Sequence, residues 1–315
     1  MSGSGVRLDW QRYVPSVVKS QEAGGGREVF RVAEDLRARI AGGAYPLGSF
    51  LPPQRELATE FKVARDTVQK ALEVLKEEGW IESRQGSGTR VVKVMQVQSY
   101  TAKDAKEGQV TLREFFDEAF DAPEIVLDVY TLTSESLETQ VKAQVNRIRE
   151  GEVTPRRVVL RMLLPEQSLD SPYPRALADP DEPQKDRPDD ELTVLLKERL
   201  HDIERRNSDS IRQSLLQLQA EGLLESAHIE MRYVKIPPVL KLYLINGTQA
   251  VHGPYTITER PIVLSDTETI RALDVVPMDS KLMHYVKDAN PRSRGSVFVD
   301  TWQEWFDSVW NHLAR

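Results

Sequence analysis

The sequence predicts a small α+β unit of three helices and a β-hairpin, followed by a larger α/β domain. Apolar residues recur at helical spacing in three short segments before residue 80, and two strand-like runs around a Gly-containing turn follow them. From residue 124 onward, strand and helix patterns alternate. The chain has 315 residues, so a second domain of about 200 residues is expected beyond the small unit.

Each helix of the small unit has a simple signature. Residues 28–40 place apolar side chains on one face. Pro52 and Pro53 suit the first turn of the second helix, where a missing backbone N–H has no cost. The third helix opens at residue 65 and its apolar residues face inward, so the polar residues at its start are exposed. These polar residues are Arg65, Asp66, Thr67, Gln69 and Lys70.

A β-hairpin completes the unit. Gly79 ends the third helix, residues 80–84 form a strand, residues 85–89 turn, and residues 90–92 return as a second strand. This order is typical of a winged helix-turn-helix, in which the exposed start of the third helix enters the major groove of DNA. Arg84 and Arg90 flank the tip of the hairpin, so we expect both to contact phosphates.

Residues 29–92 closely resemble the DNA-binding domain of the GntR family of bacterial transcription regulators. The positions in register run along the whole unit and include Ile40, Gly43, Pro46, Gly48, Leu51-Pro52, Arg55, Leu57-Ala58, Phe61, Val63, Arg65, Thr67-Val68, Ala71-Leu72, Leu75, Gly79 and Gln85-Gly86-Ser87-Gly88-Thr89. The resemblance implies that Arg55, Arg65 and Thr67 contact DNA and that Gly86 lies at the tip of the wing.

Two positions depart from the family pattern, since Ala64 replaces a common serine and Gln69 replaces an arginine that often contacts DNA. The operator sequence therefore stays open. The arginines also have a plainer interpretation as surface charges. In that interpretation Arg55 is a solvated helix residue paired with Glu56 or Glu60, and the arginine that opens the third helix is an ordinary solvated surface charge.

Composition narrows the function classes. The net charge is −7, yet the small unit is nearly balanced, with roughly eleven basic against ten acidic side chains. DNA binding must then depend on a few placed arginines and on dimerisation. The absence of cysteine excludes disulfides and a cysteine nucleophile, and the five histidines have no metal-site spacing, so neither a metal nor a cofactor is predicted. With no long apolar run and no signal peptide, the expected location is the bacterial cytoplasm, on the nucleoid when bound to DNA.

Four segments are predicted along the chain. Residues 1–26 form a partly flexible N-terminal extension, 27–92 the winged helix, 93–113 a linker, and 114–315 a domain for dimerisation and effector binding. In the last segment the strand, helix and strand patterns at 124–131, 134–149 and 157–164 indicate a parallel unit. A polar surface loop is expected at 165–190. Further helices are predicted at 192–203, 208–221, 267–274 and 299–313, and further strands at 228–234, 240–245, 250–257 and 262–264.

One pattern in the second domain resembles a catalytic motif. Val239-x-Lys241-x4-Asn246-x6-Gly253 has the spacing of the phospholipase D motif, with valine for the histidine and asparagine for the aspartate. Residues 115–314 are therefore similar to a degenerate phospholipase D-like domain, and the predicted fold class is an α+β winged helix-turn-helix followed by an α/β phospholipase D-like domain. In that superfamily the histidine attacks phosphorus, a task that valine cannot perform, so no catalytic residue is predicted.

An anion site is the expected remnant of the motif. Lys241 and Asn246 both carry N–H donors, and His252 lies beside Gly253, so these four residues are the predicted ligand site for a phosphate-bearing effector. Alternatively, Lys241 is an edge-strand residue with its head in water, and Asn246 is the left-handed residue of a turn. The tryptophans at 302, 305 and 310 have helical spacing and indicate core or a dimer interface.

The functional expectation is a non-enzymatic transcriptional regulator, acting as a repressor, that binds a palindromic operator as a homodimer and responds to a small-molecule effector at the C-terminal domain. Two alternatives stay open. One is a phospholipase D-like phosphodiesterase tethered to DNA, which would need His252 in place of the missing nucleophile. The other is a plasmid-maintenance regulator whose C-terminal domain serves only dimerisation.

Overall fold

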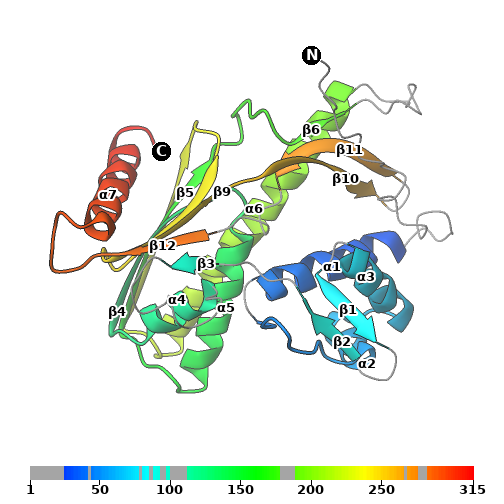
Figure 1. Cartoon of the computed structure of the whole chain (residues 1–315), viewed down its shortest axis with the longest axis horizontal. Helices are drawn as coiled ribbons and strands as arrows, with labels where there is room; N and C mark the ends of the chain where they lie inside the picture. The colour runs from blue at the N-terminus through cyan, green and yellow to red at the C-terminus, as the bar shows by residue number, and fades with distance from the viewer. Residues whose placement is uncertain are drawn as a thin grey trace, which may run out of the picture.

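The computed structural model describes residues 25–41, 44–77, 80–84, 88–92, 97–99, 112–177, 189–265, 268–275 and 282–315. Figure 1 shows a small helical unit with a hairpin beside a larger unit built on a seven-stranded sheet. Several sequence-based expectations lie outside the described residues: nearly all of the N-terminal extension, Gly86 with the wing tip, most of the linker, and the second half of the polar loop.

The small unit contains the three predicted helices, α1 (Gly25–Ala41), α2 (Gln54–Phe61) and α3 (Arg65–Glu77). Their inward faces close a common core, in which Leu36, Leu57 and Leu75 are fully buried. Pro53 precedes α2 in an extended conformation, and Lys62 ends that helix in the left-handed conformation with φ of 55°. The tight turn into α3 therefore begins at Lys62.

The wing is the antiparallel pair β1 (Ile81–Arg84) and β2 (Gly88–Val91). The chain just before α2 adds to this hairpin, because the N–H of Gly48 donates to the carbonyl of Val91 at 2.8 Å. The N–H of Leu51 donates to the carbonyl of Thr89 at 2.9 Å. These bonds attach the segment that leads into α2 to strand β2 of the wing.

The large sheet has the strand order β3-β12-β9-β8-β4-β5-β7. Neighbours β4, β5 and β7 run parallel, which confirms the predicted parallel unit, whereas β8, β9 and β12 pair antiparallel. The second domain is therefore mixed α+β rather than purely α/β. The strands are β3 (Val97–Ser99), β4 (Glu124–Tyr130), β5 (Arg157–Pro165), β7 (Ser226–Val234), β8 (Leu240–Ile245), β9 (Gln249–Pro254) and β12 (Leu282–Val286).

Helices cover the two faces of this sheet unequally. One face packs against α4 (Leu112–Phe120), α5 (Glu135–Arg149) and the C-terminal half of α6 (Asp189–Ala220). Of the described helices, α7 (Arg294–His312) alone packs against the other face. Figure 1 shows α7 in red on one side of the sheet and α5 with α6 on the other. A smaller sheet of β10 (Ile257–Ser265), β11 (Glu268–Val275) and β6 (Arg175–Ala176) packs on the N-terminal half of α6.

Several predicted elements were wrong. The helices expected at 192–203 and 208–221 are one helix, α6, because no Gly or Pro interrupts the joint and the Ser208 hydroxyl donates to Glu204 at 2.7 Å. The helix expected at 267–274 is strand β11, whose buried residues Ile270 and Ala272 alternate as a strand requires. The strand expected at 250–257 ends with β9, and β10 begins at Ile257.

The boundaries of the second domain also differ from expectation. Strand β3 lies inside the segment assigned to the linker and pairs parallel with β12, and α4 begins at Leu112. The segment 165–177 is not a solvated loop, since Tyr173 is 2% exposed and Ala176 belongs to β6. Strand β3 and the short strand β6 carry too few apolar residues for periodicity to reveal them, and long-range pairing decides their conformation.

Candidate nucleic-acid interface

The start of α3 is open to solvent. Arg65, Asp66 and Gln69 are exposed, while Thr67 and Lys70 are half-buried on the adjoining flank of the helix. The neighbouring Val68 is fully buried, so the apolar stripe of the helix turns these polar residues outward. Such an exposed first turn is the surface that a recognition helix presents to base edges.

The charged side chains of α2 and of the start of α3 differ in whether another side chain of the protein already pairs with them. Within the described ranges, neither Arg55 nor Arg65 has an ion-pair or hydrogen-bond partner for its guanidinium group. The alternative pairing of Arg55 with Glu60 does not form, because Glu60 pairs with Arg39 of α1. Lys70 lies 2.8 Å from Asp66, one helical turn earlier. The two arginines are therefore the side chains with the most hydrogen-bonding capacity left for DNA.

The wing presents a third exposed arginine. Arg90 is exposed, and its Nε donates to the carbonyl of Gly48 at 3.0 Å, which leaves its terminal N–H groups for a phosphate. Gly48 has φ of 83°, and a side chain there would meet Arg90 at 2.9 Å, so the glycine permits this contact. Arg84 ends β1 next to the turn of the wing, where it pairs with Gly88.

Three helices, an exposed third-helix start and a paired wing define a winged-helix DNA-binding domain. Residues 29–91 match the family described as bacterial regulatory proteins of the gntR family. The N-terminal unit is therefore a GntR-family DNA-binding domain. The match ends at the wing and leaves the larger domain outside the region of similarity.

Relatives with assigned roles share the same region. The Exu regulon transcriptional regulator of Escherichia coli strain K12 is 44% identical over 62 residues, 20% of this chain and 24% of that protein. The mannosyl-D-glycerate transport/metabolism system repressor MngR of the same organism is 44% identical over 68 residues, 21% of this chain and 28% of that protein. The similarity thus spans only about a quarter of these relatives, which are transcriptional regulators and not enzymes.

A solved structure covers a similar stretch. The DNA-binding domain of AraR in complex with the operator ORR3 is 32% identical to this chain and covers 21% of this chain and 78% of that one, with a TM-score of 0.20. The N-terminal domain of AraR with a mutant ORR3 gives the same identity and TM-score.

The phospholipase D-like motif in the second domain is spread over β8, its turn and β9. Lys241 and Gly253 lie opposite each other in the antiparallel pair, but Asn246 follows the far end of β8, about 17 Å along the strand. Asn246 has φ of 52° and its Oδ1 accepts the N–H of Val126 at 2.8 Å, so it is the left-handed residue of the hairpin turn. The four predicted ligand residues therefore do not form one pocket.

Lys241 is buried in the sheet rather than held at an edge. It is 2% exposed, its Nζ donates to the Ser136 hydroxyl at 2.7 Å, and it lies 5.9 Å from the ring centre of Tyr255. Burial lowers the pKa of Lys241 to about 8, and the nearby carboxylate of Glu135 opposes this shift. Both sequence-based interpretations of this lysine, as an open anion ligand and as a solvated edge residue, were wrong.

His252 lies on the opposite face of the sheet from Lys241. It pairs across the strands with Leu242, whose side chain belongs to the core beneath α7. Its ring packs 4.8 Å from that of Phe298 and 6.0 Å from that of Trp302, and burial lowers its pKa. A histidine in this place cannot replace a nucleophile beside Lys241, which removes the geometric basis of the phosphodiesterase alternative.

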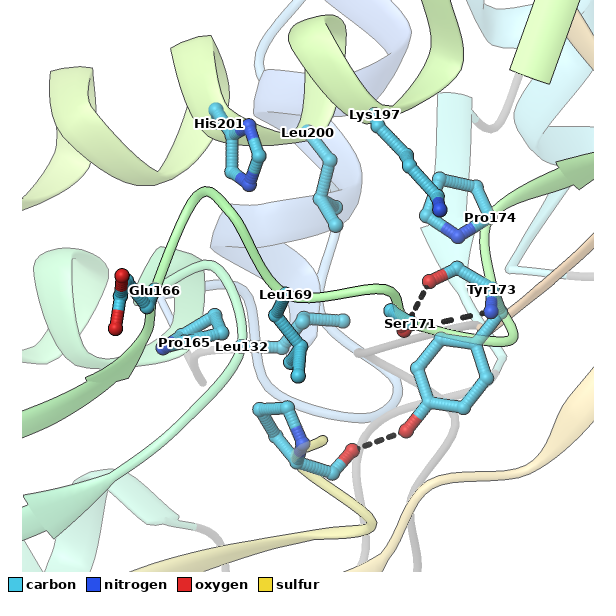
Figure 2. A pocket seen from close by; sticks show the side chains of 11 residues that line it. Leu132, Pro165, Glu166, Leu169, Ser171, Tyr173, Pro174, Lys197, Leu200 and His201 are labelled. Carbon is cyan, nitrogen blue, oxygen red and sulfur yellow. Dashed lines mark hydrogen bonds between the residues drawn. The ribbon is translucent and has the colours of Figure 1, made fainter. Parts of the chain in front are cut away.

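A groove opens at the carboxyl ends of β4 and β5, where α/β domains commonly bind ligands. Figure 2 shows Lys197, Leu200 and His201 reaching into it from α6, above the segment that carries Tyr173. Most of its wall is apolar, and the hydroxyl of Tyr173 donates to the carbonyl of Pro238 at its base. Burial lowers the pKa of His201, so the lysine is the cation of the groove.

Periodicity did not reveal these groove residues. Lys197 and His201 lie four positions apart on a helix, a spacing that also fits any solvated helix face. The signal that pointed to this part of the fold was the parallel strand-helix-strand unit, whose strand ends converge on one edge. Within the described residues, no cluster of three metal-binding side chains occurs. Nor does any described helix have the length and apolar character of a membrane span.

Proposed function

We propose that the protein is a one-component transcriptional regulator of the bacterial cytoplasm that recognises an operator through α3 and the wing. The observation that carries this proposal is the exposed start of α3, where Arg65 is open to solvent, together with the exposed arginines Arg55 of α2 and Arg90 of the wing. Repression is the proposed mode, supported by the similarity to a protein named as a repressor.

A genome-wide map of binding sites tests this function. We expect a short enriched sequence with two related halves, located beside promoters. The recovered sequence should also bind the purified protein in a competition assay at fixed salt, since non-specific DNA binding varies steeply with salt. Binding spread evenly over the genome, with no enriched sequence, would contradict the proposal.

The operator is proposed to bind a homodimer, because one winged helix reads only a few base pairs and this one has a nearly balanced charge. For the protein alone, we expect light scattering to report a mass of twice 35.8 kDa, the mass of one chain. In the complex with DNA, the mass that remains after the mass of the DNA is subtracted should be the same. Halving the operator to one half-site should weaken binding by at least about tenfold. A monomer on DNA at micromolar concentration would refute the dimer.

The larger domain is proposed to be a degenerate phospholipase D-like domain that has become a sensor. Support comes from the spacing of Val239, Lys241, Asn246 and Gly253 along a hairpin that follows a parallel unit. Because Lys241 is buried, the effector site is proposed to be the groove of Figure 2. There Lys197 pairs, among the residues that the structure describes, with Asp170 alone, at 3.1 Å. That aspartate is fully exposed, so a phosphate-bearing effector can displace it from the lysine.

A thermal-shift screen of nucleotides and sugar phosphates tests the sensor. A binding compound should raise the melting temperature by about 3 °C or more at saturating concentration. Lys197→Ala should remove this shift, while Lys287→Ala, which removes a lysine paired with Asp300 elsewhere in the domain, should retain it. No shift with the unmodified protein across the screen would instead favour a domain that serves only dimerisation.

A further inference from the structure

The last strand of the large sheet, β7, has an open edge. It pairs with β5 on one side only. On the other side the N–H and carbonyl of Tyr233 bond to Arg315 at 2.9 and 3.0 Å, and the N–H of Ala227 donates to the Gln219 side chain at 3.0 Å. Because alternate residues of a strand direct their backbone groups to the same edge, those of Ile229 and Met231 also point outward.

These two central residues meet no further strand in the described parts of the chain. Such an edge can pair with another strand. The edge of β7 is therefore occupied at Ala227 and Tyr233 and open between them. The open stretch is long enough for a short antiparallel pairing with another strand.

An apolar helix face runs beside this edge. Gln219 of α6 reaches β7, and Arg212 lies near Tyr233, so this side of α6 follows the strand along its length. Leu216 lies one turn before Gln219 and is 45% exposed, and Leu223, just after the helix, is 39% exposed. The two exposed leucines therefore lie on the part of the chain that follows the edge strand, whose own apolar side chains are half-buried.

The outer face of β7 carries an imidazole, which can donate a hydrogen bond, and a carboxylate, which can accept one, in positions that complement a second copy of the same strand. His228 is exposed and lies 3.8 Å from Glu230, which also pairs with Arg232 at 2.7 Å. If Ile229 pairs with Ile229 of the partner subunit across a two-fold axis, His228 lies opposite Glu230 of the partner subunit on both sides of the axis. A pairing of Ile229 with Met231 of the partner subunit would instead place the two Glu230 carboxylates face to face.

We propose that the free edge of β7, with Leu216 and Leu223, is the surface through which two copies of this chain join, with Ile229 on the two-fold axis. The two large sheets then form one continuous sheet, and the two copies of α6 pack their leucines beside the joint. This inference names the surface for the dimer of the proposed function and depends on that dimer existing.

A cross-linking experiment tests the register, since the chain has no cysteine of its own. Residues 228 and 230 of opposite subunits form a non-hydrogen-bonded pair with Cα atoms about 4.5 Å apart, within disulfide range. Under mild oxidation the double variant His228→Cys/Glu230→Cys should form mostly covalent dimer on a non-reducing gel. Glu230→Cys alone should form little. Equal yields from the two variants, or no covalent dimer from either, would overturn the proposed register.

A second experiment tests the surface without touching the strand. Leu216→Glu/Leu223→Glu should shift the mass in light scattering from dimer to monomer at micromolar concentration. The variant should still unfold cooperatively, at a lower temperature because the stabilisation by the partner subunit is lost. Val297→Glu on α7, where the side chain is 50% exposed, is the matched control and should stay dimeric. A persistent dimer in the leucine variant overturns this surface alone. If the unmodified protein is itself monomeric and binds no operator, that result contradicts the proposed function and not only this surface.

Discussion

Arg65→Ala is expected to weaken operator binding by about 1–3 kcal/mol, or roughly 5- to 150-fold, and to relax the preference at one base pair of each half-site. The reason is that Arg65 is exposed at the start of α3 and has no partner for its guanidinium among the described residues. An arginine in that position of a recognition helix pairs with the acceptor edge of a guanine. The measurement is a fluorescence-anisotropy titration with operator DNA at fixed salt.

Two comparisons make the Arg65 result specific. Arg206→Ala removes an exposed arginine of α6 with the same charge change, and it should leave operator affinity within about twofold. Binding of the Arg65 variant to a random duplex should fall far less than its binding to the operator, since phosphate contacts remain. Unchanged operator affinity would show that α3 does not enter the groove as proposed.

Replacing the buried lysine is expected to change how stability depends on pH. The folded pKa of Lys241, about 8, lies below its ordinary value of 10.5, so the unfolded chain holds one more proton between these two values. As far as Lys241 is concerned, the free energy of unfolding is therefore highest above about pH 10, and this contribution is lost as the pH falls through 8. We expect Lys241→Met, which removes the charge, to gain stability over the unmodified protein at pH 7.

That gain should shrink by on the order of 2–3 kcal/mol between pH 7 and pH 10, as measured by urea unfolding at each pH. Loss of the hydrogen bond to Ser136 is a pH-independent cost of about 1 kcal/mol and does not alter the trend. Lys235→Met, at a lysine whose side chain is 62% exposed, should show no such trend. A constant difference across this pH range would mean that Lys241 is charged and satisfied in the folded protein.

Local signals made the DNA-binding unit predictable. The prolines before α2, the inward stripe of α3 and the glycines of the wing each act within a few residues, and the family resemblance confirmed their order. The parallel unit of β4, α5 and β5 was predictable for the same reason, since each of its strands is a mostly apolar run, interrupted by Asp128 in β4 and by Arg161 in β5.

The remaining misses come from interactions across the fold. Strand β11 exists because β10 pairs with it, although residues 268–275 alone also fit a helix. The spacing of the motif placed Lys241 and Asn246 in one hairpin but could not show that β8 is central and that α5 covers the lysine. The site residues separated because a strand directs successive side chains to opposite faces, which a linear motif does not record.

The uninterrupted length of α6 has a mechanical consequence. The helix is about 48 Å long, and about 33 Å of it separates Lys197 at the proposed effector groove from Gln219 at the β7 edge. A rigid rod of that length works as a lever: a tilt of about 5° at the groove moves the far end by about 3 Å. If the effector binds in the proposed groove and the dimer forms at the β7 edge, the ligand changes the angle at which the two subunits meet, although it is too small to reach the other subunit. The separation of their two recognition helices changes with that angle.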